Sequence, residues 1–252
     1  MIYTLIRNAA AVLTMGGHHF LIDPSLDPVG ARPPVANTPN QKPNPLVPLP
    51  VNWKLAVESA DAHVITHLHK DHFDDTAAAV LDLARPTFCQ TEDEGRLASV
   101  GFSDLRPVAE EAEFEGVRLA RTGGHHGTGA IGEAMAPVSG FVFEVDNGLP
   151  VYLAGDTIWC DEVAEVISTH RPGVIIVNAS GARFLEGDPI VMTAEDVAEV
   201  HRAAPEAMIV IVHLEAINHC LETREHYRSR LPELGVEMDR IRIPYNGESV
   251  VW

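Results

Sequence analysis

The stretch that decides the fold is Thr66-His67-Leu68-His69-Lys70-Asp71-His72, in which three histidines and an aspartate fall within six residues. It follows directly on a short, largely apolar run. In an extended segment alternate side chains share a face. His67 and His69 can therefore reach one ion from the end of a strand, while Asp71 and His72 approach from beyond the turn. One short loop can thus serve two metal ions.

Imidazole and carboxylate donors together suit zinc, iron or manganese better than calcium or magnesium, which prefer oxygen. The alternative interpretation is a solvated polar turn that happens to be rich in histidine. Such a turn has no reason to be followed by further candidate ligands downstream, and here they do follow. The cluster therefore predicts a metal site.

Further candidate ligands stand at the ends of three strand-like segments. Gly116–Arg121 leads to His125 and His126, Val151–Ala154 leads to Asp156, and Ala207–Val212 leads to His213. A group at the tip of a buried strand lies at the edge of a sheet, where loops gather and sites form. The sequence thus indicates a site assembled from several strand ends.

Strands and helices alternate along much of the chain. Strands are predicted at Ile2–Arg7, Ala11–Met15, His19–Asp23, Val151–Ala154, Gly173–Asn178 and Ala207–His213. Helices are predicted at Asp75–Ala84, Asp161–His170, Thr193–Ala203 and Glu222–Arg230. Thr193 with Asp196 forms a plausible capping box. This order fits two packed sheets flanked by helices, and 252 residues with 46% hydrophobic content fit one domain spanning 1–252.

The ligand series as a whole resembles that of the metallo-β-lactamase-fold hydrolases. The matching positions are His67, His69, Asp71, His72, a glycine-flanked histidine, Gly155-Asp156-Thr157 and a strand-terminal histidine. Within the superfamily the chain most resembles the L-ascorbate-6-phosphate lactonase-like branch. That likeness is carried by Leu21–Pro24, Asn44–Val47, Gly155–Trp159 and Val212–His219. The resemblance spans essentially the whole chain and implies an α/β fold, a four-layer αββα sandwich of two mixed sheets flanked by helices.

The resemblance also implies how the ligands divide. His67, His69 and His126 would hold one divalent ion, Asp71, His72 and His213 a second, and Asp156 with a water or hydroxide would bridge them. The ions would be zinc, or else manganese or iron. Asp71 would also orient the hydroxide.

Two of these assignments have competitors. His125 competes with His126, which is preferred because His126-Gly127-Thr128-Gly129 keeps a glycine three residues on. His219 competes with His213, which is preferred because it ends a strand. His219 is then a pocket residue or a catalytic proton donor.

The chemistry follows from such an arrangement. Two divalent ions roughly 3.5–4 Å apart lower the pKa of a shared water to near neutrality and polarise a carbonyl or phosphoryl oxygen, so no serine or cysteine nucleophile is needed. The resemblance favours hydrolysis of a lactone or another small ester, phosphorylated or not, with a small phosphodiester as the runner-up. A phosphorylated substrate would need a basic clamp, for which Lys70, Arg183 and Arg224 are candidates.

Two other functions are weighed against hydrolysis. A di-iron oxidoreductase of the same fold would usually carry a glutamate at the position of His69, and a flavin domain for which 252 residues leave no room. A metal-binding protein without catalysis would be expected to have lost a ligand, whereas every position is filled here.

Several polar residues near the cluster are open to two interpretations. Asp23, in the turn before Pro24, either supports a metal-binding histidine or simply forms the turn. Weaker pocket candidates are Asn178, Asp188, Glu215 and Trp159.

The segment Arg32–Pro50 contains seven prolines, so it can form neither a helix nor a central strand. Long loops in compact domains are usually functional or disordered. A linker would need a second domain on its far side, and only about thirty residues precede it. The loop is therefore expected to form a lid or wall over the metal site.

Charge and cysteine content limit which binding partners and which cellular locations are expected. The net charge of −18 argues against nucleic acid, whose binding depends on neutralising phosphates. Cys89, Cys160 and Cys220 are too few and too widely spaced for a disulfide framework. The apolar run Ala9–Met15 leads into the next strand, so a signal peptide is not expected. We expect a small-molecule substrate, no nucleic-acid or membrane partner and a cytoplasmic location, with a homo-oligomer left open.

Overall fold

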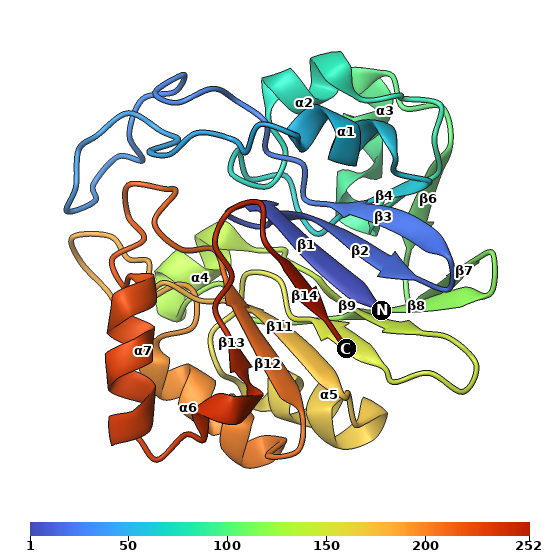
Figure 1. The fold of residues 1–252 in the computed structure, drawn as a ribbon. Coiled ribbons are helices and arrows are strands. Elements are labelled where there is room, and N and C mark those ends of the chain that lie inside the picture. Colours follow the sequence, from blue (N-terminus) through green and yellow to red (C-terminus); the bar gives the residue numbers. More distant parts are fainter.

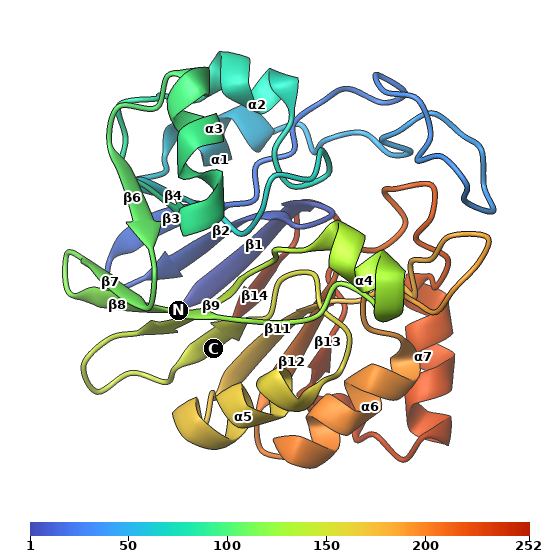
Figure 2. The same ribbon diagram turned by 180° about the vertical axis from the view of Figure 1, so that it is seen from behind.

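Two seven-stranded sheets pack face to face in the computed structural model, which describes residues 1–252 (Figures 1 and 2). The first sheet has the order β14 (Ser249–Val251), β1 (Ile2–Arg7), β2 (Ala10–Met15), β3 (His18–Ile22), β4 (Ala62–Ile65), β5 (Thr87–Gln90) and β6 (Leu105–Val108). The second has the order β13 (Ile241–Arg242), β12 (Met208–Val212), β11 (Val174–Asn178), β10 (Val151–Leu153), β9 (Gly140–Glu144), β8 (Val117–Thr122) and β7 (Glu111–Phe114).

Both sheets are mixed. The first is antiparallel from β14 to β3 and parallel from β3 to β6. The second is antiparallel from β7 to β10 and parallel from β10 to β13. Parallel neighbours need a crossover connection, usually a helix, and six of the seven helices connect parallel neighbours.

The crossover helices cover the outer faces of the sheets (Figures 1 and 2). On the first sheet they are α1 (Trp53–Glu58), α2 (Asp75–Val80) and α3 (Glu94–Val100), and on the second α5 (Asp161–His170), α6 (Ala194–Ala203) and α7 (Arg224–Glu233). A further short helix, α4 (Gly129–Met135), lies beside the loops at one edge of the sandwich, and two 3₁₀ turns span Thr91–Asp93 and Met238–Arg240. The four-layer αββα architecture expected from the sequence is confirmed.

Three apolar layers hold the sandwich together. The central layer lies between the sheets and contains 22 buried residues, among them Phe20 and Phe143, whose rings meet edge to face at 5.6 Å. The outer layers lie beneath α5–α7 and beneath α1–α3. Strand β11 shows the division, because Ile176 faces the central layer while Ile175 and Val177 face the helices.

Most predicted elements appear, with shifts at their ends. The meander β1–β3 and the capping box of Thr193 and Asp196 at α6 are confirmed. Helix α2 ends at Val80 rather than Ala84, because Leu81 turns to an extended conformation. Helix α7 begins at Arg224 because the Thr223 side chain caps it.

The connections from β4, β8, β10, β11 and β12 gather at one edge of the sandwich, which Figure 1 shows below the blue proline-rich loop. That loop, Arg32–Pro50, lies beside the loops that follow β11 and β12. Backbone bonds tie it to both of them, from Leu185 N to Asn37 O at 2.7 Å and from Leu46 N to Ala216 O at 2.7 Å. The loop edge therefore carries the predicted ligands.

Candidate metal centre

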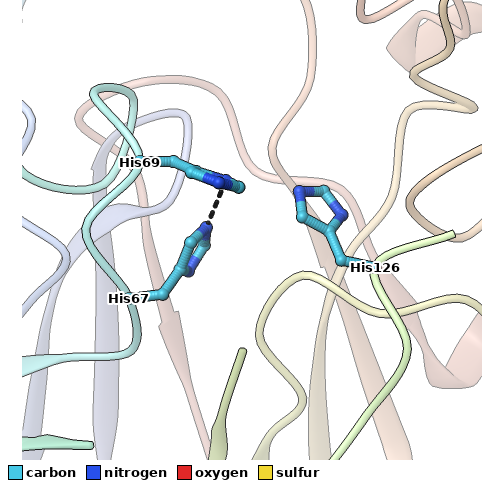
Figure 3. Close-up of side chains that lie close together, drawn as sticks. All are labelled: His67, His69 and His126. Atoms are coloured by element: carbon cyan, nitrogen blue, oxygen red, sulfur yellow. Dashed lines mark hydrogen bonds between the residues drawn. The ribbon is translucent and has the colours of Figure 1, made fainter. Parts of the chain in front are cut away.

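Three histidines form the first group of donor atoms at this edge. His67 and His69 come from the loop after β4, and His126 comes from the loop after β8 on the opposite sheet (Figure 3). Nε2 of His67 lies 3.0 Å from Nδ1 of His69. The donor atoms of all three lie within 4.8 Å of one another, as the ligands of one ion must.

A second group of donors consists of Asp71, His72, Asp156 and His213, again with all atoms within 4.8 Å. Asp71 and His72 come from the loop after β4, Asp156 follows β10, and His213 follows β12 directly. Nε2 of His213 lies 3.2 Å from Oδ2 of Asp71.

The Asp156 carboxylate lies between the two groups. Its Oδ2 is 3.5 Å from Nε2 of His126 in the first group and 3.2 Å from Nε2 of His72 in the second. Its Oδ1 is 3.8 Å from Nε2 of His213 and accepts a hydrogen bond from Nδ2 of Asn178 at 2.7 Å. This is the placement that a bridging carboxylate requires.

Hydrogen bonds orient the histidine rings from behind. Nδ1 of His72 donates to Oδ2 of Asp23 at 2.9 Å, and Nδ1 of His126 donates to the carbonyl oxygen of Ile190 at 2.7 Å. Nδ1 of His67 lies 3.1 Å from Oγ1 of Thr66, whose hydroxyl donates to Asp23 at 2.8 Å. Because one ring nitrogen is used on the outside, the other is free to face an ion. Of the two interpretations of Asp23, these hydrogen bonds favour the one in which it supports candidate metal-binding histidines.

The donor set fits divalent metal ions. Nε2 of His72 is buried and has no hydrogen-bond partner, although a buried polar atom normally has one. Five imidazoles and two carboxylates are also the donors that zinc and other transition metals prefer.

Two residues of the site have left-handed backbone conformations, with φ of +40° at Asp23 and +69° at His213. Residues other than glycine rarely adopt this region, and the strain is commonest at functional sites. Nδ1 of His213 faces the Cys220 sulfur at 3.6 Å.

Burial and neighbouring charges shift the pKa values of the histidines in different directions in the two donor groups. Burial lowers the pKa of His69 to about 4 and also lowers that of His67 and His126, so these rings are neutral at pH 7, as metal-binding imidazoles are. Burial acts the same way on His72, but Asp156, Asp23 and Asp71 outweigh it and raise its pKa to about 10. The second group is therefore an environment that favours positive charge.

The structure separates the competing histidines. His126 lies in the first group, whereas the His125 side chain is 53% exposed and Nε2 contacts Oε1 of Glu162 at 2.8 Å. His213 lies in the second group. His219 lies in the wall of the adjoining pocket, where its ring stacks on Phe184 with centroids 6.4 Å apart.

A pocket of about 230 Å³ opens onto both groups of donors, and we call it the metal pocket. It is lined by His69, Asp71, His126 and Asp156, together with Arg32, Val35, Asn44, Lys70, Met135, Phe184, Ile217 and His219. Nδ1 of His219 is buried without a hydrogen-bond partner. Arg32, Val35 and Asn44 belong to the proline-rich loop, which thus forms one wall of the pocket as expected.

The basic residues considered for a phosphate clamp already have partners. Lys70 contacts Asp75 at 2.6 Å, and Arg224 is buried and contacts Glu215 at 2.6 Å. Nε of Arg183 donates to the carbonyl oxygen of Gly181 at 3.2 Å. Arg32, which the sequence did not single out, lines the metal pocket but contacts Asp27 at 2.9 Å.

The four weaker pocket candidates differ in their positions relative to the metal centre. Asn178 lies at the centre through its bond to Asp156, whereas the partners of Asp188 and Glu215 are Thr128 and Arg224. Trp159 packs against the apolar layer beneath α5–α7. None of these four side chains lines the metal pocket.

Sequence reasoning missed several residues of the site. Phe184, Ile217 and Met135 line the metal pocket, Thr66 and Ile190 orient ligands, and Asn218 holds the proline-rich loop. Thr66, Ile217 and Asn218 lie within stretches quoted above, but none of the missed residues is a histidine or carboxylate that would mark it as a candidate ligand. Asn218 has the most telling position, directly before His219.

None of the helices is long and apolar enough to cross a membrane.

Comparison with known proteins gives consistent matches. Residues 18–214 match a family described as the beta-lactamase superfamily domain. UPF0173 protein YddR of Bacillus subtilis (strain 168) is 39% identical over 98% of each chain. A UPF0173 metal-dependent hydrolase of Rubrobacter xylanophilus is 25% identical over 94% of this chain and 90% of its own.

Two solved structures superimpose closely. One is described as a possible metal-dependent hydrolase from Veillonella parvula DSM 2008, with 35% identity, a TM-score of 0.95 and coverage of 99% of this chain and 98% of its own. The other is an isothiocyanate hydrolase from Delia radicum gut bacteria, with 33% identity, a TM-score of 0.94 and coverage of 100% and 99%.

Proposed function

The chain belongs to the beta-lactamase superfamily and is a metal-dependent hydrolase, and on that premise we propose that it uses two divalent metal ions to hydrolyse a small, uncharged substrate at an electrophilic carbon. The observation that carries this proposal is the pair of donor groups that face one carboxylate, Asp156, from both sides.

The assignment of ligands follows these groups. His67, His69 and His126 would hold one ion, Asp71, His72 and His213 the other, and Asp156 both. Two such ions, when bound, lower the pKa of a shared water and polarise the bond to be cleaved. We propose zinc, with manganese or iron as alternatives, because the histidine-rich donor set suits all three.

Two side chains in the metal pocket have the position for further roles. The Asp71 carboxylate is 17% exposed, so one of its oxygens can accept a hydrogen bond from the attacking water. The His219 side chain lines the metal pocket, so its ring can donate a proton to, or accept one from, the leaving group. In lactone hydrolysis the water oxygen joins the carbonyl carbon, the ring C–O bond breaks, and the ring oxygen takes a proton.

The substrate class rests on charge. A phosphodiester needs unpaired cations beside the metals, and the two cationic side chains that line the metal pocket, Lys70 and Arg32, contact Asp75 and Asp27. The sequence favours lactones and small esters, phosphorylated or not, and a neutral member of this class needs no such clamp. An isothiocyanate is the second candidate, because a structure 33% identical over the whole chain is an isothiocyanate hydrolase.

Metal content tests the first part of the proposal. Protein purified without added metal should contain about two ions per chain by plasma mass spectrometry, and Asp156→Ala should contain fewer. Asp188→Ala, which removes an exposed carboxylate bonded only to Thr128, is the matched control and should keep the wild-type content. A wild type that contains no metal and binds none on addition would sink the proposal.

Turnover tests the second part. The metal-loaded protein is assayed with γ- and δ-lactones, alkyl isothiocyanates and bis(p-nitrophenyl) phosphate. We expect activity on one of the two carbon electrophiles, reduced by Asp156→Ala and unaffected by Asp146→Ala, which removes an exposed carboxylate in the turn after β9. Faster turnover of the phosphodiester would overturn the choice of carbon over phosphorus while leaving the metal centre in place.

A further inference from the structure

We propose that an apolar chamber beside the metal pocket binds a hydrophobic substituent of the substrate, so that the enzyme acts on neutral molecules with an electrophilic head and an apolar tail. The chamber has a volume of about 530 Å³ and is lined by the apolar side chains Ala130, Ile131, Ala134, Met135, Phe184 and Leu185. This inference rests on the proposed function and extends it to the shape of the substrate.

The chamber adjoins the metal pocket and shares two wall residues with it. Met135 and Phe184 line both spaces, and the Phe184 ring stacks on His219 at an interplanar angle of 16°. A molecule whose head reaches the donor groups beside His219 can therefore extend past Phe184 into the chamber. This shared wall points to a part of the substrate as the occupant of the chamber.

The walls of the chamber are tied together by specific contacts. Leu185 N donates to the carbonyl oxygen of Asn37 at 2.7 Å, which fixes the tip of the proline-rich loop to one wall. Oγ1 of Thr128 donates to Asp188 at 3.0 Å, which ties the start of α4 to the loop after β11. Figure 2 shows α4 beside that loop.

The apolar side chains of the chamber are only partly covered by protein. Ile131, Met135 and Phe184 rest on a small buried cluster of Ala182, Ile190 and Val191. Helix α4 buries none of its residues, and Leu185 is 67% exposed. Apolar surface that is concave, adjoins a reactive centre and lacks a protein partner is typical of a ligand site. A hydrophobic substituent would remove this surface from water.

Size and charge define the substituent. The chamber lies within the range of small-molecule sites, so it can hold a medium-length alkyl chain or an aryl ring. Its polar lining residues are Asn37 and Glu186, and the carboxylate of Glu186 would repel an anionic tail. Burial among six apolar side chains would also remove water from the charge of a cationic tail, which is unfavourable. The tail is therefore uncharged, which agrees with the neutral head inferred above.

A binding series tests the chamber without requiring turnover. Linear hydroxamates from acetohydroxamate to octanohydroxamate share a metal-chelating head and differ only in tail length, and calorimetry on the metal-loaded protein gives their affinities. Each buried methylene should tighten binding roughly fourfold until the chamber is full, from the transfer free energy of a CH₂ group. Equal affinity across the series, or no binding by any member, overturns the proposal.

Variants of α4 locate the effect. Ala134→Trp and Ala130→Phe fill the chamber and should weaken octanohydroxamate binding at least roughly tenfold, given several methylenes displaced, while acetohydroxamate binding stays within about twofold. Glu133→Trp is the matched control, since this exposed residue lies on the same helix but outside the chamber lining. Metal content is measured for each variant to verify an intact centre.

The outcomes separate this inference from the proposed function. A chain-length effect that Ala134→Trp abolishes and Glu133→Trp preserves supports the chamber even if no lactone or isothiocyanate is turned over. An effect that survives both filling variants overturns it, whatever the activity of the enzyme.

Discussion

At the scale of single residues, one carboxylate supports ligands of both donor groups. Asp23 accepts the Nδ1 hydrogen of His72 directly, and it reaches His67 through the Thr66 hydroxyl. Its second oxygen accepts the backbone N–H of Thr66 at 2.8 Å. Three bonds to one buried group explain why the strained backbone at Asp23, with φ of +40°, is retained.

We expect Asp23→Asn to weaken metal binding about 10- to 100-fold, the usual cost of losing a group that orients a ligand. The amide matches the carboxylate in shape, but one of its two positions becomes a donor that opposes the hydrogen bonds from His72 and Thr66. Competition with a chromogenic chelator measures the affinity. Asp61→Asn is the control, because Asp61 accepts from His19 N far from the site along β3. Unchanged affinity in Asp23→Asn would contradict this role.

His63 predicts a specific pH dependence of stability. It is buried in β4, where Nδ1 contacts Oγ1 of Thr87 at 3.1 Å, and burial lowers its pKa to about 4. In the unfolded chain the pKa of His63 keeps its ordinary value near 6.5. Between about pH 4 and pH 6.5 the unfolded chain therefore binds more protons at His63 than the folded protein does, and stability falls as the pH drops through this range. From pH 7 to pH 5 the loss from this group is about 2 kcal/mol.

The variant His63→Gln should therefore lose less of its free energy of unfolding between pH 7 and pH 5 than the wild type does. Urea unfolding at the two pH values measures this difference. His226→Gln removes an exposed histidine on α7 and should behave as the wild type. An identical pH dependence in His63→Gln and wild type would refute the assignment.

At the scale of elements, the proline-rich loop has no helix or strand of its own, and its shape depends on one asparagine. Oδ1 of Asn218 accepts from Val35 N at 3.0 Å and from Nδ2 of Asn44 at 2.7 Å. Its Nδ2 donates to Oγ1 of Thr38 at 2.7 Å and to the carbonyl oxygen of Asn40. Every hydrogen-bonding position of this buried side chain is used to hold the loop.

Replacement of Asn218 by alanine should release the loop from the metal pocket. Buried groups of Asn44 and Thr38 lose partners, at about 1–3 kcal/mol each, so we expect clear destabilisation and faster hydrogen exchange in peptides covering 32–50. Exchange mass spectrometry measures the second effect directly. Asn40→Ala, which leaves these side-chain bonds intact, is the control. Equal exchange rates in the two variants would show that the loop is held by other contacts.

At the scale of the whole molecule, the metal centre joins the two sheets. His67, His69, Asp71 and His72 follow a strand of the first sheet, whereas His126, Asp156 and His213 follow strands of the second. Bound ions would therefore link the two halves across the loop edge, in addition to the apolar layer between the sheets.

Removal of metal should accordingly lower the Tm of the whole protein. A free metal concentration of 100 times the Kd adds about 2.7 kcal/mol to the free energy of unfolding. For a chain of this length, its loss corresponds to a Tm decrease of roughly 5–10 °C. Calorimetry before and after treatment with dipicolinate, and again after metal is restored, measures the change. Asp156→Ala should show a smaller response. The same Tm in treated protein that has verifiably lost its metal would contradict a cross-linking role.

The resemblance that the sequence carries implied the four-layer fold, and it named the seven residues that the structure gathers into the two donor groups, with His125 and His219 as competitors. This was feasible because His67, His69, Asp71 and His72 lie within one loop, and because His126, Asp156 and His213 each follow an apolar strand. Both signals are local, since they depend on spacing along the chain and on the periodicity of strands. Short elements such as α4 and β13 were not predicted, because few residues carry their hydrophobic pattern.

The tertiary structure decided what depends on contacts between distant segments. It separated His126 from His125 and showed that Asp23 supports ligands of both groups. It also revealed Asn218 as the anchor of the loop and joined Met135 to Phe184 in one chamber. Neighbours far apart in sequence leave no periodic signal, because their proximity arises only when the two sheets pack and bring their loops to the same edge.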